Sequence, residues 1–164
     1  MVAQITDSGS RRQMLLSEES ELEQLIRDLF ASQKLAVLGT QNRGQPYANL
    51  IAFAASEDLT SLYFVTGRAT RKYANIEADA RVTVLIDNRS NQDSDFSQAA
   101  AVTATGAAQE VVGSKRDEVL AIYLAKHPML EEFVRSPTCA LLRVEVQTYY
   151  LVRRFQNVME LHVR

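Results

Sequence analysis

The sequence predicts a mainly β (α+β) fold, a closed antiparallel barrel of six or seven strands flanked by helices. Two observations favour this class. The β-type stretches follow one another mostly as hairpins, and helical periodicity appears only at intervals between them. The regular strand–helix alternation of a doubly wound parallel sheet is missing, as are a glycine-rich dinucleotide fingerprint and a P-loop.

Length and composition predict one domain. The chain has 164 residues, and we expect a flexible N-terminal arm at residues 1–16 and a single domain at residues 17–164. The formal net charge of -2 argues against general nucleic-acid binding. A single cysteine, Cys139, excludes an intramolecular disulfide and fits a reducing compartment. No stretch resembles a signal peptide or a membrane span, so we expect a cytoplasmic protein without membrane contacts.

The first half of the domain begins with a helix that Ser17 or Ser20 can cap. Its apolar residues recur at helical spacing: Leu22, Leu25, Ile26, Leu29 and Phe30. Residues 35–40 and 47–55 then read as a β-hairpin around a turn-rich segment, and a third strand follows at 61–66.

The second half adds further strands and two or three short helices. A helix follows Thr70 and ends near Asp79, and a second helix begins after Ser114, with a short third one at Pro128. The predicted strands are residues 81–87, 99–112, 139–152 and 156–163, and residues 88–96 form a loop. Gly106 predicts a bulge or a close backbone approach within the second of these strands.

Cations and hydroxyls gather where the third strand turns into the following helix. Thr70 is a suitable N-cap, and Arg71 offers a planar fork that suits phosphate oxygens. The first turn of a helix has free N–H groups and the positive end of the dipole, so an anion there would offset the repulsion between these cations. A solvated basic turn is the alternative interpretation.

This order of hairpin, strand and basic helix start resembles the pyridoxamine 5'-phosphate oxidase-like family of FMN-binding split β-barrels, which are small dimeric flavoproteins. The resemblance covers residues 35–163. It implies that the FMN phosphate is held by the following residues: Thr66, Thr70, Arg71 and Lys72. It also implies that the flavin ring rests against the second strand at about residues 49–53, whose backbone groups meet its polar edge. The candidate site residues in this stretch are Asn49, Ile51, Ala52 and Phe53.

The resemblance extends to a second set of residues. The run that includes Asn88 and Arg89 looks like one branch of the family, and Arg154 is a candidate for the flavin edge across a homodimer. Because neighbouring strand residues point to opposite faces, at most one of Arg153 and Arg154 is expected to face that site. Solvated strand residues are the alternative.

The chain also departs from the classical oxidases of the family. Their second strand carries an arginine and a lysine, where this chain has Asn49 and Ala54, and their C-terminal arginine-rich substrate motif is replaced by residues 152–156. We therefore expect an FMN-dependent oxidoreductase that acts on an unidentified small molecule and is not a pyridoxamine phosphate oxidase. The alternatives are a flavin- or haem-binding carrier or sensor, and a deazaflavin-dependent reductase.

Other chemical motifs are absent from the sequence. His127 and His162 have no metal-ligand spacing to another histidine or cysteine, so no metal is expected. Cys139 begins an apolar strand and is expected to be buried. No residue stands out as a catalytic acid or base, and the only expected partners are the substrate and a second copy of the chain, with a cofactor site at the interface.

Overall fold

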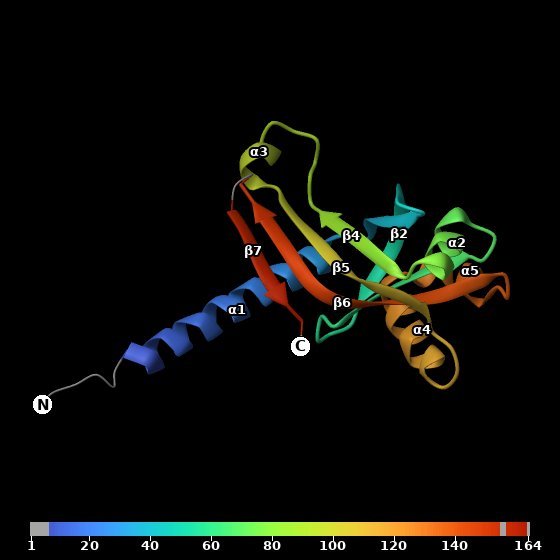
Figure 1. Ribbon diagram of the computed structural model, residues 1–164, viewed down its shortest axis with the longest axis horizontal. Helices are drawn as coiled ribbons and strands as arrows, with labels where there is room; N and C mark the ends of the chain where they lie inside the picture. Colours follow the sequence, from blue (N-terminus) through green and yellow to red (C-terminus); the bar gives the residue numbers. More distant parts are fainter. Residues whose placement is uncertain (1–6, 155–156, 164) are drawn as a thin grey trace, which may run out of the picture.

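The computed structural model describes residues 7–154 and 157–163, in which seven strands form one antiparallel sheet (Figure 1). The strand order is β3-β2-β1-β4-β5-β6-β7, and β3 also pairs with β6. Six strands therefore close into a barrel, and β7 extends the sheet beyond β6. The predicted mainly β barrel with flanking helices is confirmed.

The elements lie close to their predicted positions. The strands are β1 (Leu35–Asn42), β2 (Gln45–Ala55), β3 (Ser61–Gly67), β4 (Arg81–Asp87), β5 (Ala100–Glu110), β6 (Cys139–Arg153) and β7 (Asn157–His162). The helices are α1 (Asp7–Ser32), α2 (Arg71–Ala78), α3 (Asp95–Gln98), α4 (Lys115–Lys126), the 3₁₀ turn η1 (Pro128–Leu130) and α5 (Glu131–Arg135). The predicted start of the last strand at Gln156 lies outside the described residues.

The first hairpin turns in two residues. Asn42 pairs with Gln45, and the intervening Arg43 and Gly44 have φ angles of 52° and 83°. Positive φ at both central positions is typical of a type I′ turn, whose twist matches that of the flanking strands. The turn is therefore shorter than the predicted one, and both strands reach further toward it.

Helix α1 begins earlier than the sequence predicted. We expected a start at Ser17 or Ser20, but the helix already includes Asp7, so residues 7–16 are helical rather than a loose arm. Residues 1–6 of the predicted arm lie outside the described residues. The prediction missed this extension because residues 7–16 have no apolar periodicity, and every side chain from residue 11 to residue 20 is exposed.

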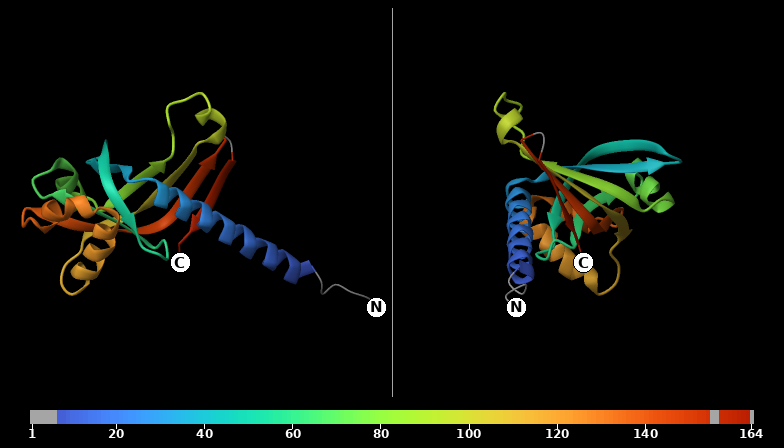
Figure 2. Two further views of the ribbon diagram at one scale, coloured as in Figure 1. Left: turned by 180° about the vertical axis from the view of Figure 1, so that it is seen from behind. Right: turned by 60° about the vertical axis from the view of Figure 1, so that its left-hand side comes forward.

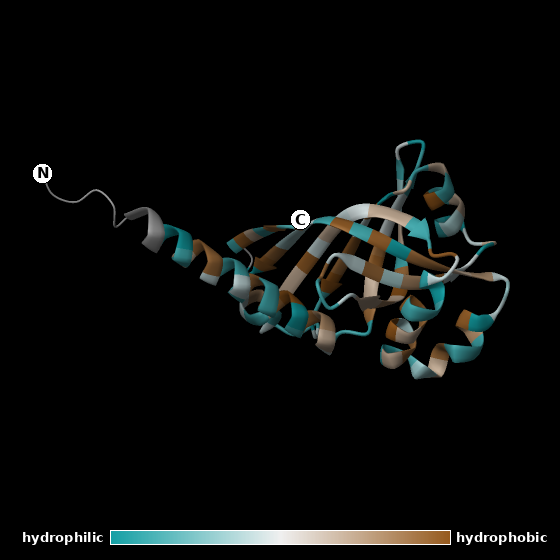
Figure 3. Cartoon of the chain, turned by 90° about the horizontal axis from the view of Figure 1, so that it is seen from below, coloured by the Kyte–Doolittle hydropathy of each residue, from teal (hydrophilic) through white to brown (hydrophobic). Residues whose placement is uncertain are grey.

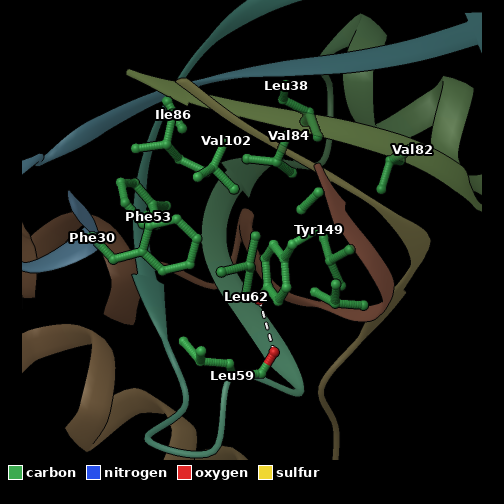
Figure 4. Packing of buried hydrophobic residues seen from close by; sticks show 14 of the residues in the cluster. Phe30, Leu38, Phe53, Leu59, Leu62, Val82, Val84, Ile86, Val102 and Tyr149 are labelled. Atoms are coloured by element: carbon green, nitrogen blue, oxygen red, sulfur yellow. Dashed lines mark hydrogen bonds between the residues drawn. The ribbon is translucent and has the colours of Figure 1, made fainter. Parts of the chain in front are cut away.

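The C-terminal half of α1 contributes to the core inside the barrel. The Phe30 ring packs edge-on against Phe53 of β2 and Tyr149 of β6, with centroid distances of 5.5 and 5.8 Å. The Tyr149 hydroxyl donates a 2.7 Å hydrogen bond to the Leu59 carbonyl, so this buried polar group is satisfied (Figure 4). The helix thus plugs the barrel with apolar side chains.

A second apolar cluster lies outside the barrel. Helix α4 places Leu120 and Tyr123 against β2, β3 and β6, where they meet Ala54, Tyr63 and Leu141. Helices α4 and α5 therefore cover one face of this sheet region, at the end of the molecule opposite α3 (Figure 1). No helix in the described part of the chain is both long and apolar enough to cross a membrane.

The predicted irregularity at Gly106 is confirmed by a register shift between Thr105 and Gly106 in the pairing of β5 with β6. A Cβ atom at Gly106 would overlap the backbone carbonyl of Glu145, whereas one at Gly39 would meet only the hydroxyl of Thr83, which can rotate away. We expect Gly106→Ala to lower the free energy of unfolding by about 1–3 kcal/mol, and Gly39→Ala to cost less. Urea denaturation of the two variants measures the difference, and equal losses would contradict it.

Candidate cofactor-binding site

The barrel is split between β2 and β3. The two strands pair only at three positions, from Phe53 opposite Phe64 to Ala55 opposite Leu62. Beyond them β3 stays paired with β6 as far as Gly67, while residues 45–52 of β2 pair only with β1. One edge of β2 is therefore free of strand pairing, as the resemblance to split barrels implied.

The direction of one hydrogen bond shows which residues present this free edge. The Phe53 N–H donates to the Lys34 carbonyl at 3.3 Å, on the β1 side. Backbone groups of successive residues in an antiparallel strand point alternately to its two edges. The backbone N–H and C=O groups of Ala48, Leu50 and Ala52 therefore point toward the opening.

One of these groups is already occupied. The Tyr123 hydroxyl of α4 donates a 3.2 Å hydrogen bond to the Ala52 carbonyl. The N–H groups of Ala48, Leu50 and Ala52 and the carbonyls of Ala48 and Leu50 remain at the edge. Such a row of donors and acceptors is ready to bind a planar ligand that has the complementary pattern.

The four predicted strand residues differ in what they offer to this edge. Ile51 and Phe53 point their side chains into the core and their backbone groups toward β1, so neither reaches the opening. Ala52 presents its N–H. The Asn49 side chain lies on the inner face, where its buried Oδ1 has no hydrogen-bond partner among the described residues. Leu50 lies within the predicted stretch 49–53, although not among these four candidates, and it offers both backbone groups.

The predicted N-cap at the start of α2 is confirmed. The Tyr73 N–H donates to the Thr70 hydroxyl oxygen at 3.4 Å, and the Thr70 hydroxyl donates to the Gly67 carbonyl at 2.8 Å. The buried hydroxyl of Thr66, at the end of β3, lies 3.0 Å from that of Thr70. Strand end and helix start thus bring both predicted hydroxyls together.

Of the three cations at this junction, Arg68 is already engaged. Its Nη1 donates to a Glu110 carboxylate oxygen at 2.7 Å, and the Tyr73 hydroxyl donates to the same oxygen at 3.0 Å. The guanidinium of Arg68 contributes most to holding the pKa of Glu110 below its usual value. Arg68 is therefore part of an internal ion pair rather than a free anion-binding group.

Arg71 and Lys72 remain available for an anion. The Arg71 guanidinium lies over the Tyr47 ring of β2, 5.3 Å from its centroid, so it reaches the strand that bears the open edge. Lys72 is partly buried, and this burial lowers its pKa. Neither cation forms an ion pair within the described ranges, and the first turn of α2 has no acidic residue. The helix start therefore carries uncompensated positive charge.

The second predicted set lies elsewhere. Asn88 accepts a 2.8 Å hydrogen bond from the Ala100 N–H, and Arg89 pairs with Asp87 at 3.1 Å. Arg154 lies in the turn after β6 with a φ angle of 50°. These residues lie toward α3, at the opposite end of the barrel from α2 (Figure 1). One chain does not bring them to the cluster at Thr70.

Neither histidine faces the opening. His127 is buried, and its Nε2 lies 2.8 Å from the Phe53 carbonyl, on the β1 side of that strand. His162 lies on β7 with its Nδ1 3.1 Å from the Thr148 hydroxyl. No cluster of three potential metal ligands exists in the described part of the chain, and Cys139 is a buried cysteine outside any disulfide.

Comparison with protein families agrees with this geometry. The family model for pyridoxamine 5'-phosphate oxidase matches residues 22–153, which is most of the chain and includes every strand except β7. This chain belongs to the pyridoxamine 5'-phosphate oxidase family. The family's match contains both the open edge of β2 and the start of α2. A comparison with curated proteins found no match.

Solved structures share the fold of this family member at low sequence identity. A haem-binding protein from Mycobacterium smegmatis has a TM-score of 0.72 and 17% identity over 80% of this chain. An FAD-binding protein from Mesorhizobium loti gives 0.63 and 14% over 79%, and HutZ, a haem storage protein from Vibrio cholerae, gives 0.65 and 16% over 76%. The matches cover 54%, 90% and 89% of those chains, so this chain spans about half of the Mycobacterium protein.

Proposed function

We propose that this chain is an FMN-binding oxidoreductase that acts on a small molecule. The observation that carries the proposal is the free edge of β2 next to a helix start with two unpaired cations, Arg71 and Lys72. The strand edge and the helix start are the two surfaces that a flavin mononucleotide needs, one for its ring and one for its phosphate.

The open strand edge suits the polar edge of a flavin ring. The pyrimidine part of the ring alternates acceptor, donor and acceptor along one side. The edge of β2 alternates N–H and C=O groups through Ala48, Leu50 and Ala52, so a donor meets each ring oxygen and a carbonyl meets the ring N–H. These groups are held by the pairing with β1, and rigid donors can tune the electron affinity of the ring.

The phosphate suits the start of α2. Its oxygens would accept from the free N–H groups of the first turn, from the Thr66 hydroxyl, and from Arg71 and Lys72. The Thr70 hydroxyl donates its one hydrogen to the Gly67 carbonyl, so it would reach the phosphate only by turning away from that carbonyl. When bound, FMN supplies hydride or electron-pair transfer, and the chain's residues bind and orient it. The buried Oδ1 of Asn49, which has no hydrogen-bond partner among the residues that the structure describes, is a further polar group on β2 that a ligand could satisfy.

A flavin fits the chain better than haem does. Haem needs an axial ligand, and the two histidines of the sequence are engaged with the Phe53 carbonyl and the Thr148 hydroxyl, away from the opening. Haem also lacks a row of alternating donors and acceptors that would pair with the strand edge. A deazaflavin presents the same ring edge and phosphate, so only chemical identification of the bound cofactor separates it from FMN.

A homodimer is part of the proposal. Side chains on the outer face of the sheet form a row across five strands, each directly opposite the next: Leu50, Val37, Leu85, Thr103 and Tyr150. Leu50 is 64% exposed and the others are half-buried. A second copy on this face would cover apolar surface, and it would bring its Asn88, Arg89 and Arg154 toward the split of its partner.

The test is the absorption spectrum and the mass of the purified protein. We expect flavin bands at about 370 and 450 nm, FMN as the cofactor released on denaturation, and a dimer or a pair of dimers, with two equivalent sites in each dimer. A haem Soret band near about 400 nm without flavin bands would overturn the FMN assignment. A monomer that retains one FMN per chain would exclude a shared site.

A further inference from the structure

The N-terminal part of α1 projects from the barrel without a partner. Figure 2 shows it extending well beyond the sheet, and the side chains of residues 11–20 are all exposed. Met14, Leu15 and Leu16 are each more than half exposed, and they form an apolar band on the projecting helix (Figure 3). We call residues 11–20 the arm from here on; this range differs from the predicted flexible arm at residues 1–16. The stability of a short helical segment in water is marginal without tertiary packing, so a surface that covers the arm would stabilise it.

The apolar face of the arm continues that of the buried part of the helix. Leu15 precedes Leu22 by seven residues and Leu29 by fourteen, so the three lie along one line of α1. Leu22 and Leu29 are buried against the barrel, whereas Leu15 is 56% exposed. Leu15 is therefore the apolar residue of this line that the chain itself leaves uncovered.

Charges are arranged symmetrically around Leu15. Arg11 and Arg12 precede it by four and three residues, and Glu18 and Glu19 follow it by three and four. At helical spacing all four lie on the same side of α1 as Leu15. The order along the arm is therefore two cations, an apolar centre and two anions. A second arm that runs in the opposite direction presents the complementary order of charges.

We propose that the arm pairs with the arm of a second copy of this chain, in antiparallel orientation around a twofold axis at Leu15. The two leucines then meet at the centre, and Arg11 and Arg12 of each copy face Glu18 and Glu19 of the other. A parallel pair would place like charges together, so the charge order selects the antiparallel one. The contact is isologous, since the same residues contribute from both sides.

A membrane surface is the other class of partner for an exposed apolar helix face, and the charges oppose it. Helices that lie on anionic lipid are rich in lysine and arginine on the polar face. Between residues 11 and 23 this helix has two arginines against four glutamates. A second copy of the arm satisfies both charge signs, whereas an anionic surface would repel the glutamates.

This contact is separate from the cofactor site and from the outer sheet face. Arm pairing and sheet-face pairing are two different twofold contacts, and a tetramer closes when their two axes meet at right angles. Loss of the arm contact would therefore halve the mass of the assembly and leave the flavin content per chain unchanged. The flavin content tests the FMN proposal, and the mass of the assembly tests the arm proposal, so the failure of one is distinguishable from the failure of the other.

Charge reversal with rescue tests the pairing by analytical ultracentrifugation. We expect Arg11→Glu/Arg12→Glu and Glu18→Arg/Glu19→Arg each to form assemblies of half the parent mass, and the quadruple variant to recover the parent mass. The two double variants change the net charge in opposite directions, so charge alone does not account for a common result. One mass for all four proteins would overturn the proposal, as would an unchanged mass combined with binding of the parent to anionic vesicles.

A cross-link gives a second readout with a matched control. Leu15→Cys places a thiol at the proposed axis, and Gln13→Cys places one on the opposite side of the same helix. The natural Cys139 is buried, so it does not compete. On mild oxidation we expect a covalent dimer from Leu15→Cys and at least tenfold less from Gln13→Cys. Equal yields would contradict an interface through Leu15.

Discussion

Arg71→Ala and Lys72→Ala are each expected to lower the affinity for FMN by about ten- to hundredfold. Each removes one charge-assisted contact to the phosphate, worth about 1.5–3 kcal/mol. Isothermal titration of the apoprotein measures the loss. Riboflavin, which lacks the phosphate, should bind the variants and the parent nearly equally. Tight binding of FMN by either variant would contradict the phosphate site.

A neighbouring arginine provides the matched control. Arg68 lies at the same junction, but its guanidinium is paired with Glu110. Arg68→Ala should therefore change FMN affinity much less than Arg71→Ala, although both remove one positive charge. Equal losses would show that long-range charge, and not direct contact, accounts for phosphate binding.

The lowered pKa of Lys72 gives the same site a pH dependence. Only the protonated amine contributes charge to phosphate binding, so its contribution is lost as the pH rises through its pKa. Burial lowers that pKa, which brings the loss to a lower pH than for an exposed lysine. FMN affinity should fall at alkaline pH in the parent and less in Lys72→Arg, because arginine stays charged.

Turnover of pyridoxamine 5'-phosphate or pyridoxine 5'-phosphate should be negligible even in the FMN-loaded protein. A phosphorylated substrate brings a second anion, which needs cations beyond those that hold the cofactor. β2 has Asn49 and Ala54 where the classical oxidases have an arginine and a lysine, and Ala54 is buried under α4. Without an anchor the substrate is not oriented at the flavin, which costs several kcal/mol of barrier.

Steady-state kinetics with both vitamers test this expectation. A kcat/KM of about 10⁴ M⁻¹s⁻¹ or more, which is in the ordinary enzyme range, would refute it. Reduction of the bound flavin by a general chemical reductant serves as the control, because it shows that the cofactor itself is competent. The low activity would then be a property of substrate binding.

Local signals allowed much of the fold to be predicted from the sequence. Residues 81–87 form β4 as the alternation predicted, and Thr70 caps α2 as its residue type and position predicted. Both depend on neighbours within a few residues. The predicted start of α1 was wrong, because residues 7–16 have no apolar periodicity and the side chains of residues 11–16 are all exposed.

The detailed geometry of the candidate site was harder to predict from the sequence. The resemblance implied a ring site on the second strand, but only the pairing register shows that alternate residues such as Leu50 face the opening. Recognition of Arg43-Gly44 as a two-residue turn would have set this parity, because it makes Asn42 and Gln45 a hydrogen-bonded pair. The engagement of Arg68 with Glu110 joins residues far apart in sequence, and no local pattern signals it.

The pairing of β3 with β6 has a consequence for how the molecule assembles. Gly67 lies opposite Cys139 and Ser61 opposite Glu145, so most of the chain must be synthesised before this seam can form. Contacts between such distant segments are typical of slow folding steps. Thr66 lies on this seam, so the proposed phosphate site is completed only when the barrel closes. The cofactor would therefore be captured by a barrel that has already closed.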